Sequence, residues 1–253
     1  LVWYVLLDIP HFFGTYVRTY LDPVERERRP LLLYGSLGLV LVGPSLIGLG
    51  CLPWAWGPEW AATYHRLPFD LLFVFVMFWA YWHVVRQHYG IMALYKRKND
   101  DSADCDGWVD SAMLYVGLMV PLLVVVLNHP ETRAQVGLTD ERLFWEFPVL
   151  TFAAVLVAMC AALFAGRQIY LWNSGEPVNL PKILFLLAVV PLHLFVAYHP
   201  ATFETSLIGF GAFVTIFHDI QYHTIVWHAQ QMKRHRRGAD PSRHGLSAWV
   251  SSN

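Results

Sequence analysis

Residues 147–166 read FPVLTFAAVLVAMCAALFAG, twenty consecutive positions without a charged side chain or a histidine. A helix of about 20 apolar residues is long enough to cross a hydrocarbon core about 30 Å thick. Comparable runs recur along the chain, and we expect membrane spans at 31–52, 69–95, 109–128, 145–172, 181–199 and 204–232, with a more polar one at 1–21. The sequence therefore predicts an all-α, polytopic transmembrane helix bundle of about seven spans.

The composition agrees with a protein that lies in a lipid membrane. The 253 residues are 56% hydrophobic, with a mean hydropathy of +0.39, and only 15% are charged, against about 25% in soluble domains. The formal net charge of -1 indicates no nucleic-acid partner. Three cysteines without Cys-x2-Cys spacing argue against a disulfide framework or a cysteine zinc site; they are Cys51, Cys105 and Cys160.

The positions of Lys and Arg predict how the bundle is oriented. Basic residues gather at 26–29, 96–98 and 233–237, after alternate spans. Cytoplasmic loops are enriched in these residues, so we expect the first residue outside and the C-terminus in the cytoplasm. We expect one transmembrane helical domain over 1–237, followed by a polar cytoplasmic tail over 238–253. Because the chain starts without Met, we also expect that it has been processed or trimmed ahead of Leu1.

Five histidines fall at one depth in the predicted bundle. They lie seven to fourteen residues from the cytoplasmic ends of the first, third and last spans, which is about 10–20 Å at 1.5 Å per residue. Ionisable residues inside spans are costly and mark functional sites. We therefore expect a metal to be bound where these spans converge, by His11, His83, His88, His218 and His223. The other seven histidines, including His129 and His193, are expected to be solvated side chains near the membrane interfaces, without a role in the site.

Two carboxylates accompany these histidines. Asp8 precedes His11 by three residues and Asp219 precedes His223 by four, so each pair shares a helix face. A carboxylate in such a place either binds the metal or holds an imidazole in its ligating tautomer. We predict one of these roles for Asp8 and for Asp219.

The histidine pairs on the third and last spans have an awkward spacing. His83 and His88, like His218 and His223, are five residues apart, which corresponds to a turn of about 140° on a regular α-helix. A π-bulge would bring both members of a pair to one face. Otherwise the two members serve different metals or different roles, so one iron and two irons both remain open.

Other polar side chains lie at the same depth. They are expected to position substrate, oxygen or water, and they are Arg86, Gln87, Tyr89, Gln221 and Tyr222. Burying any of these side chains without a hydrogen-bond partner costs free energy. The alternative is a hydrogen-bonded polar core that holds helices together without a metal.

The donor types narrow the choice of metal. Imidazole with carboxylate suits iron, copper or zinc, and a haem bound between two histidines is a further alternative. Zinc would activate water. Up to five imidazoles from three helices favour non-haem iron, mononuclear or dinuclear, with open positions for oxygen.

Three motifs resemble, in order and spacing, those of the bacterial Brp/Blh-type β-carotene dioxygenase family. They are Pro-His at 10–11, His-Tyr-Gly at 88–90, and Phe-His at 217–218 with a second histidine five residues after the first. The family has Pro-His-Gly, His-Phe-Gly and Trp-His-x3-His on membrane helices that hold one iron. The resemblance implies that the iron ligands are His11, His88, His218 and His223. The chain departs from the pattern at Phe12, at Tyr89 and in the wider late pair.

These observations predict an integral-membrane oxidoreductase of the oxygenase, desaturase or hydroxylase type. It would use non-haem iron to oxidise a lipid- or carotenoid-like molecule that enters from the bilayer, with an electron donor or partner subunit. One alternative is a non-catalytic membrane subunit that binds haem or pigment through axial histidines. Another is a metal or proton transporter, although transport usually requires broken helices at the site.

Overall fold

The computed structural model describes residues 2–101, 104–135, 138 and 143–235, and within these ranges the chain is helical and contains no strand. Five helical segments are long and apolar enough to cross a membrane: Pro30–Trp56, Pro58–Lys98, Asp106–Asn128, Glu146–Asn173 and Leu180–Tyr198. They correspond to five of the predicted spans, and the all-α class is confirmed. The spans predicted at 1–21 and 204–232 are not among these five, and their crossing of the membrane stays a prediction.

The chain forms two compact units. The central unit is Val74–Val214, and the terminal unit joins Leu1–Phe73 to Thr215–Asn253. The cytoplasmic tail that the sequence predicts over 238–253 lies outside the described residues.

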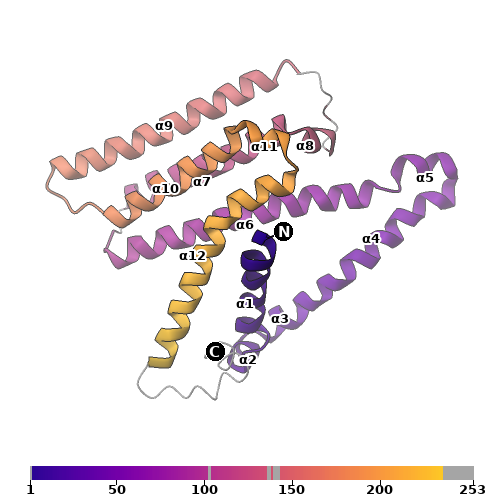
Figure 1. The fold of residues 1–253 in the computed structure, drawn as a ribbon, viewed down its shortest axis with the longest axis horizontal. Coiled ribbons are helices and arrows are strands. Elements are labelled where there is room, and N and C mark those ends of the chain that lie inside the picture. Colours follow the sequence, from indigo (N-terminus) through magenta and orange to yellow (C-terminus); the bar gives the residue numbers. More distant parts are fainter. Residues whose placement is uncertain (1, 102–103, 136–137, 139–142, 236–253) are drawn as a thin grey trace. The chain divides into compact units, whose positions relative to one another are not determined.

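The central unit is built mainly from long helices. It contains most of α6 (Leu67–Lys98), then α7 (Asp104–Asn128), α8 (Pro130–Gln135), α9 (Glu146–Asn173), α10 (Leu180–Tyr198), α11 (Pro200–Glu204) and the start of α12 (Leu207–His235). Helix α7 packs against both α9 and α10 (Figure 1). Its contact with α9 is a cluster of small aliphatic side chains, Val120, Val124 and Ala153.

One glycine allows the close approach of α7 and α10. A Cβ atom added at Gly117 would lie 2.6 Å from Cγ1 of Val190. Small residues let helix backbones approach closely in a membrane, where van der Waals packing replaces the hydrophobic effect as the driving force. Gly117 is therefore a packing residue of the central unit.

Ion pairs join the helices of this unit at both ends. At one end, Arg133 donates to Glu146 Oε2 at 2.7 Å, and both side chains are buried. At the other end, the fully buried Lys182 contacts Asp110 at 2.9 Å and Asp101 at 2.8 Å. A buried charge is tolerated only when it is paired and hydrogen-bonded, so these pairs fix which helix ends lie together.

Asp101, the loop carboxylate that pairs with Lys182, has a shifted pKa. Burial by itself would raise the pKa of Asp101. Hydrogen bonds from Lys182 and Asn179, and the charges of Lys182 and Lys96, outweigh burial and leave that pKa below its ordinary value. Asp101 is therefore ionised in the folded protein at neutral pH.

The terminal unit contains the shorter N-terminal elements. They are η1, a π-helix (Tyr4–Asp8), then α1 (Ile9–Thr19), α2 (Pro23–Arg28), α3 (Pro30–Leu37), η2 (Gly38–Leu41), α4 (Val42–Cys51), η3 (Leu52–Trp56) and α5 (Pro58–Tyr64). Helix α2 begins where the Asp22 side chain accepts from the Val24 amide at 3.0 Å, an N-cap. The turn before α5 uses Gly57 at φ +117°, a backbone conformation that glycine adopts without steric cost.

Within the terminal unit, η1 and α1 run beside α12 (Figure 1). The side chains of Trp3, His11 and Thr15, at positions spaced by multiples of four residues, contact α12, as does the backbone carbonyl of Leu7. Spacing by four places side chains on one helix face. This face carries the polar groups considered next.

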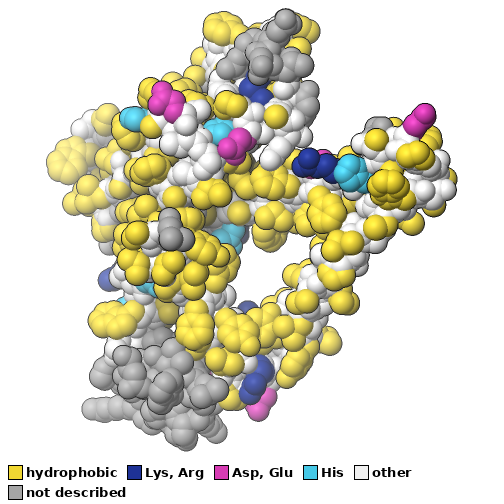
Figure 2. All heavy atoms as spheres, turned by 45° about the vertical axis from the view of Figure 1, so that its right-hand side comes forward, with side chains coloured by type: hydrophobic (Ala, Val, Ile, Leu, Met, Phe, Trp, Pro, Cys, Tyr) yellow, Lys and Arg dark blue, Asp and Glu magenta, His cyan; other side chains and the backbone are white. Residues whose placement is uncertain are grey.

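Hydrophobic side chains cover much of the surface visible in Figure 2, between few charged ones. Leu31 is 90% exposed and Val40 is 74% exposed, both in the segment Pro30–Trp56. Apolar exposure of this extent marks a membrane or protein contact. It suits helices whose outer faces meet lipid.

Candidate metal centre

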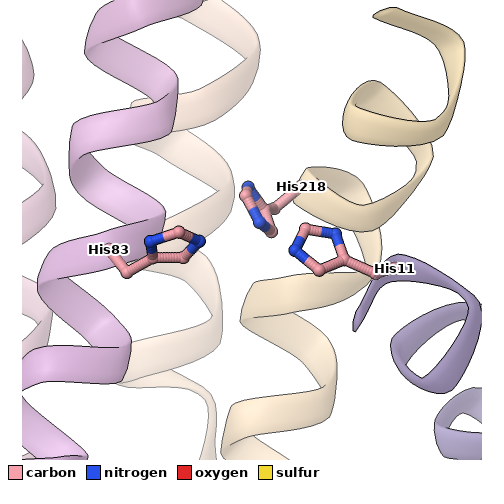
Figure 3. Close-up of side chains that lie close together, drawn as sticks. All are labelled: His11, His83 and His218. Atoms are coloured by element: carbon pink, nitrogen blue, oxygen red, sulfur yellow. The ribbon is translucent and has the colours of Figure 1, made fainter. Parts of the chain in front are cut away.

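Helices α1 and α12 of the terminal unit bring two buried imidazoles together. His11 lies in the first turn of α1, and His218 lies in α12. Their ring centroids are 5.1 Å apart, and their facing ligand nitrogens lie within 4.8 Å of each other (Figure 3). Two imidazole nitrogens on one ion, each at about 2.1 Å, are about 3–4 Å apart. A small side-chain movement therefore brings His11 and His218 to ligand distance of one ion.

The next residue of α12 is a carboxylate that contacts His11. Asp219 Oδ1 lies 3.5 Å from Nδ1 of His11, and Asp219 is 1% exposed. Its other oxygen, Oδ2, accepts a hydrogen bond from Nε1 of Trp3 at 3.2 Å. A carboxylate on the Nδ1 side favours the tautomer with the lone pair on Nε2, as in many metal sites. The geometry suits Asp219 as the residue that orients His11 more than as a direct ligand.

Tyr222 and His223 follow on α12, and His223 is turned about 140° from His218 because it lies five residues further along a regular α-helix. The Tyr222 ring lies 4.0 Å from the His11 ring, centroid to centroid, and its hydroxyl shares a 2.5 Å hydrogen bond with Thr15. His223 Nε2 lies 3.2 Å from the carbonyl oxygen of Leu7. A carbonyl only accepts, so Nε2 of His223 carries the proton and Nδ1 of the neutral ring holds the lone pair. His223 therefore offers Nδ1 for a metal.

The π-helical geometry occurs at a different place from the one considered in the sequence. Helices α6 and α12 are α-helical through both histidine pairs, so the π-bulge alternative is wrong there. The π-helix is η1, directly before α1 and His11. Irregular turns of this kind are frequent at functional sites. Asp8 ends η1, is half-buried, and forms no hydrogen bond or ion pair with the described residues.

The remaining predicted ligands, His83 and His88, belong to α6 in the central unit. Regular helical geometry separates them: His83 is exposed and His88 is fully buried. The Nε2 atom of His83, which is also drawn in Figure 3, shares a hydrogen bond of 2.7 Å with Gln87.

His88 contacts a histidine that the sequence analysis set aside. Its ring lies 5.6 Å from that of His193 on α10, and both are 0% exposed. Tyr81 donates its hydroxyl proton to the Leu118 carbonyl at 2.7 Å and lies 3.0 Å from His193 Nδ1. Since a phenol has one proton, His193 donates Nδ1–H to Tyr81, which leaves its lone pair on Nε2.

The prediction that His129 and His193 are solvated side chains near the membrane interfaces is wrong, because both are buried. His193 is 0% exposed and contacts Tyr81 and His88 of α6, and His129 is 1% exposed, with its Nε2 3.1 Å from the Thr205 carbonyl. Counting residues from a span end measures depth but not which face of the helix a side chain occupies. A lone histidine in the apolar run of α10 was the available signal, since such a side chain needs a buried partner.

The other predicted polar residues fall in both units. Arg86 donates to the Tyr115 hydroxyl and lies over the Tyr89 ring, 5.1 Å from its centroid, in the central unit. Gln221 belongs to α12 in the terminal unit, and its Oε1 is buried without a hydrogen-bond partner among the described residues. Sequence reasoning did not single out Trp3, Thr15 or Tyr115, which hold members of the predicted set in place.

Comparisons with known proteins add no relative to this description. The resemblance to β-carotene dioxygenases rests on the three motifs alone and stays a prediction. No protein-family model matches the chain, and comparison with curated proteins and with solved structures gave no match.

Proposed function

We propose that this protein is an integral-membrane oxidoreductase with a histidine-ligated non-haem iron centre that oxidises a hydrophobic substrate with oxygen. One observation carries the proposal: His11 and His218 lie together on neighbouring helices, with Asp219 on the Nδ1 side of His11. Buried imidazoles from two helices with a carboxylate behind one of them form a typical arrangement of metal ligands and their support.

The donor set fits iron. In the proposal, His11 binds through Nε2 and His223 through Nδ1, and His218 supplies a third imidazole. Nitrogen donors with a carboxylate nearby and open positions are the ligands of oxygen-activating non-haem iron, whereas the soft thiolates that favour other centres are missing from this set. The bound iron supplies the activation of oxygen.

The surrounding residues keep these donors in position. Trp3 donates to Asp219, and Asp219 holds the Nδ1 side of His11. Thr15 fixes the Tyr222 hydroxyl, so the Tyr222 ring stays against His11. Each of these contacts limits rotation of an imidazole, and rigid ligands bind a metal with a smaller loss of conformational entropy.

The apolar character of the chain supports a hydrophobic substrate. Five helical segments have the length and composition of membrane spans, and a molecule dissolved in the bilayer reaches such helices without crossing water. A lipid- or carotenoid-like compound has these properties. The proposal also includes an electron donor or a partner subunit, because reductive activation of oxygen consumes electrons.

Metal analysis of the purified protein, with its absorption spectrum, tests the proposal. We expect iron without a Soret band from protein made in iron-replete cells. The variants His11→Ala and His218→Ala should lose most of the iron. His65→Ala is the matched control. His65 lies in the same unit but outside the cluster, and its Nδ1 is hydrogen-bonded to the backbone carbonyl of Ala61.

Three outcomes would count against it. A Soret band would favour the haem-binding subunit. Full iron content in both His11→Ala and His218→Ala would show that these histidines do not bind the iron. Zinc alone after iron-replete expression would point to activation of water instead of oxygen. His83→Ala and His88→Ala, measured in the same series, test the two further ligands that the sequence predicts.

A further inference from the structure

Arg86 is a cation with an unusual environment. It lies in α6, within the apolar segment Pro58–Lys98, twelve residues before Lys98. At 1.5 Å per residue this is about 18 Å along the helix from the basic end. A guanidinium at such a depth is costly unless an anion or a wet cavity compensates it. We therefore expect the group that binds Arg86 to carry negative charge.

The neighbours of Arg86 do not supply that charge. Its guanidinium donates to the Tyr115 hydroxyl and lies over the Tyr89 ring. Among the described residues Arg86 forms no ion pair with a carboxylate, and its side chain is exposed. A guanidinium has five N–H donors in a planar fork that matches a carboxylate, and a single tyrosine leaves most of them for a ligand.

The same residues form an aromatic stack. The Tyr115 ring lies 5.6 Å from that of Trp82 with an interplanar angle of 22°, and 5.4 Å from that of Tyr89 with an angle of 25°. These three rings and the Arg86 side chain belong to α6 and α7 of the central unit. Because the ring faces meet one another within the stack, an extended apolar or polyene chain would contact the exposed edges of these half-buried rings.

We propose that Arg86, Tyr115, Tyr89 and Trp82 form a site for the carboxylate end of a long-chain hydrophobic acid. The guanidinium binds the carboxylate, Tyr115 and Tyr89 hold the guanidinium, and the aromatic stack contacts the beginning of the chain. This inference goes beyond the proposed function, since it names an acidic, amphipathic ligand of the central unit; only the role of that acid as the substrate rests on the proposed function. The depth of Arg86 favours a free acid within the bilayer over a phospholipid headgroup.

Binding of a fluorescent conjugated-polyene fatty acid and of its methyl ester tests the site. Energy transfer from tryptophan to the polyene reports binding to the full-length protein in lipid nanodiscs. We expect the acid to bind about tenfold more tightly than the ester, which equals about 1.4 kcal/mol. Arg86→Gln should remove this preference, and Tyr115→Phe should reduce it several-fold. Arg66→Gln is the matched control, because the exposed Arg66 pairs with Asp70 outside the site.

The possible outcomes separate this site from the iron centre. A preference for the acid that persists in Arg86→Gln would overturn the proposal, as would equal displacement of the probe by a single-chain phospholipid and by a fatty acid. Tyr115→Phe provides the second test if Arg86→Gln fails to fold, and an unchanged preference there also overturns it. The His218→Ala variant should still prefer the acid, and Arg86→Gln should retain the wild-type metal content, so failure of one proposal is distinguishable from failure of the other.

Discussion

Asp219 Oδ1 lies 3.5 Å from His11 Nδ1, while Asp219 Oδ2 accepts from the indole of Trp3 at 3.2 Å. One carboxylate in the middle of α12 therefore contacts both the first turn of α1 and Trp3, the residue directly before the π-helix η1. The orientation of His11 depends on a residue that is distant from it in sequence. This relationship has a direct consequence for metal binding.

We expect Asp219→Asn to weaken metal affinity by about 10–100-fold, the usual effect of losing a carboxylate behind a ligating histidine. Metal titration of the purified apo-protein measures this change. Asp70→Asn is the matched control, since Asp70 lies in the same unit and forms an ion pair with the exposed Arg66, outside the cluster. Unchanged affinity in Asp219→Asn would show that this carboxylate does not orient a ligand.

Removal of the Tyr81 hydroxyl should destabilise the central unit without changing the metal content. Tyr81→Phe loses the hydrogen bonds to the Leu118 carbonyl and to His193. A buried donor or acceptor that loses its partner costs about 1–3 kcal/mol. Thermal unfolding in detergent measures the loss, and metal analysis tests the second part. Loss of iron in Tyr81→Phe would instead connect His193 to the metal.

Gly117→Ala should lower stability by about 1–3 kcal/mol, the usual cost of overpacking. The new methyl group would lie 2.6 Å from Cγ1 of Val190, so α7 and α10 would have to separate. Gly166→Ala is the control, because a Cβ atom there meets nothing within 4 Å. The double variant Gly117→Ala with Val190→Ala should recover part of the loss, and failure to recover would contradict a local steric cause.

The lowered pKa of Asp101 predicts how stability depends on pH. A carboxyl whose pKa is lower when folded stabilises the protein above its unfolded pKa of about 3.9, and this contribution is lost as pH falls through the folded value. We expect wild-type stability to decline below about pH 4, and Asp101→Asn to be less stable at neutral pH with a smaller decline. Melting temperatures between pH 3 and 7 test this, with Asp100→Asn as the control. Parallel curves for wild type and Asp101→Asn would rule out the contribution.

The local parts of the fold could be predicted from the sequence. The run 147–166 contains no charged residue, and its twenty residues match the thickness of the bilayer core as a helix. The position and length of this helix therefore follow from the composition alone. The helices that make up the five apolar segments, α3 to α7 with α9 and α10, lie where the runs predict them. The segment around His218 is harder to interpret, because the polar residues that make it functionally interesting also lower its hydropathy.

The site could be predicted only in part. Equal depth placed His11 and His218 at one level of a bundle, and the structure brings these two rings side by side. The π-helix at Tyr4–Asp8 and the burial of His193 could not be predicted, since both depend on which helix faces meet after folding. The role of Tyr115 beside Arg86 depends on the packing of α6 and α7, which no local pattern encodes.

The pairing of Lys182 with Asp110 has a consequence for how the protein is made. Asp110 of α7 pairs with Lys96 of α6 as well as with Lys182 of α10, so ribosomal synthesis delivers one of its partners before it and the other after it. Helices α6 and α7 can therefore pair their opposite charges before α10 emerges. Lys182 is the late charge: a cation within an apolar helix resists entry into lipid unless it is paired, and its two carboxylate partners, Asp101 and Asp110, are synthesised before it. The order of synthesis thus favours insertion of α10 against helices that have already left the translocon.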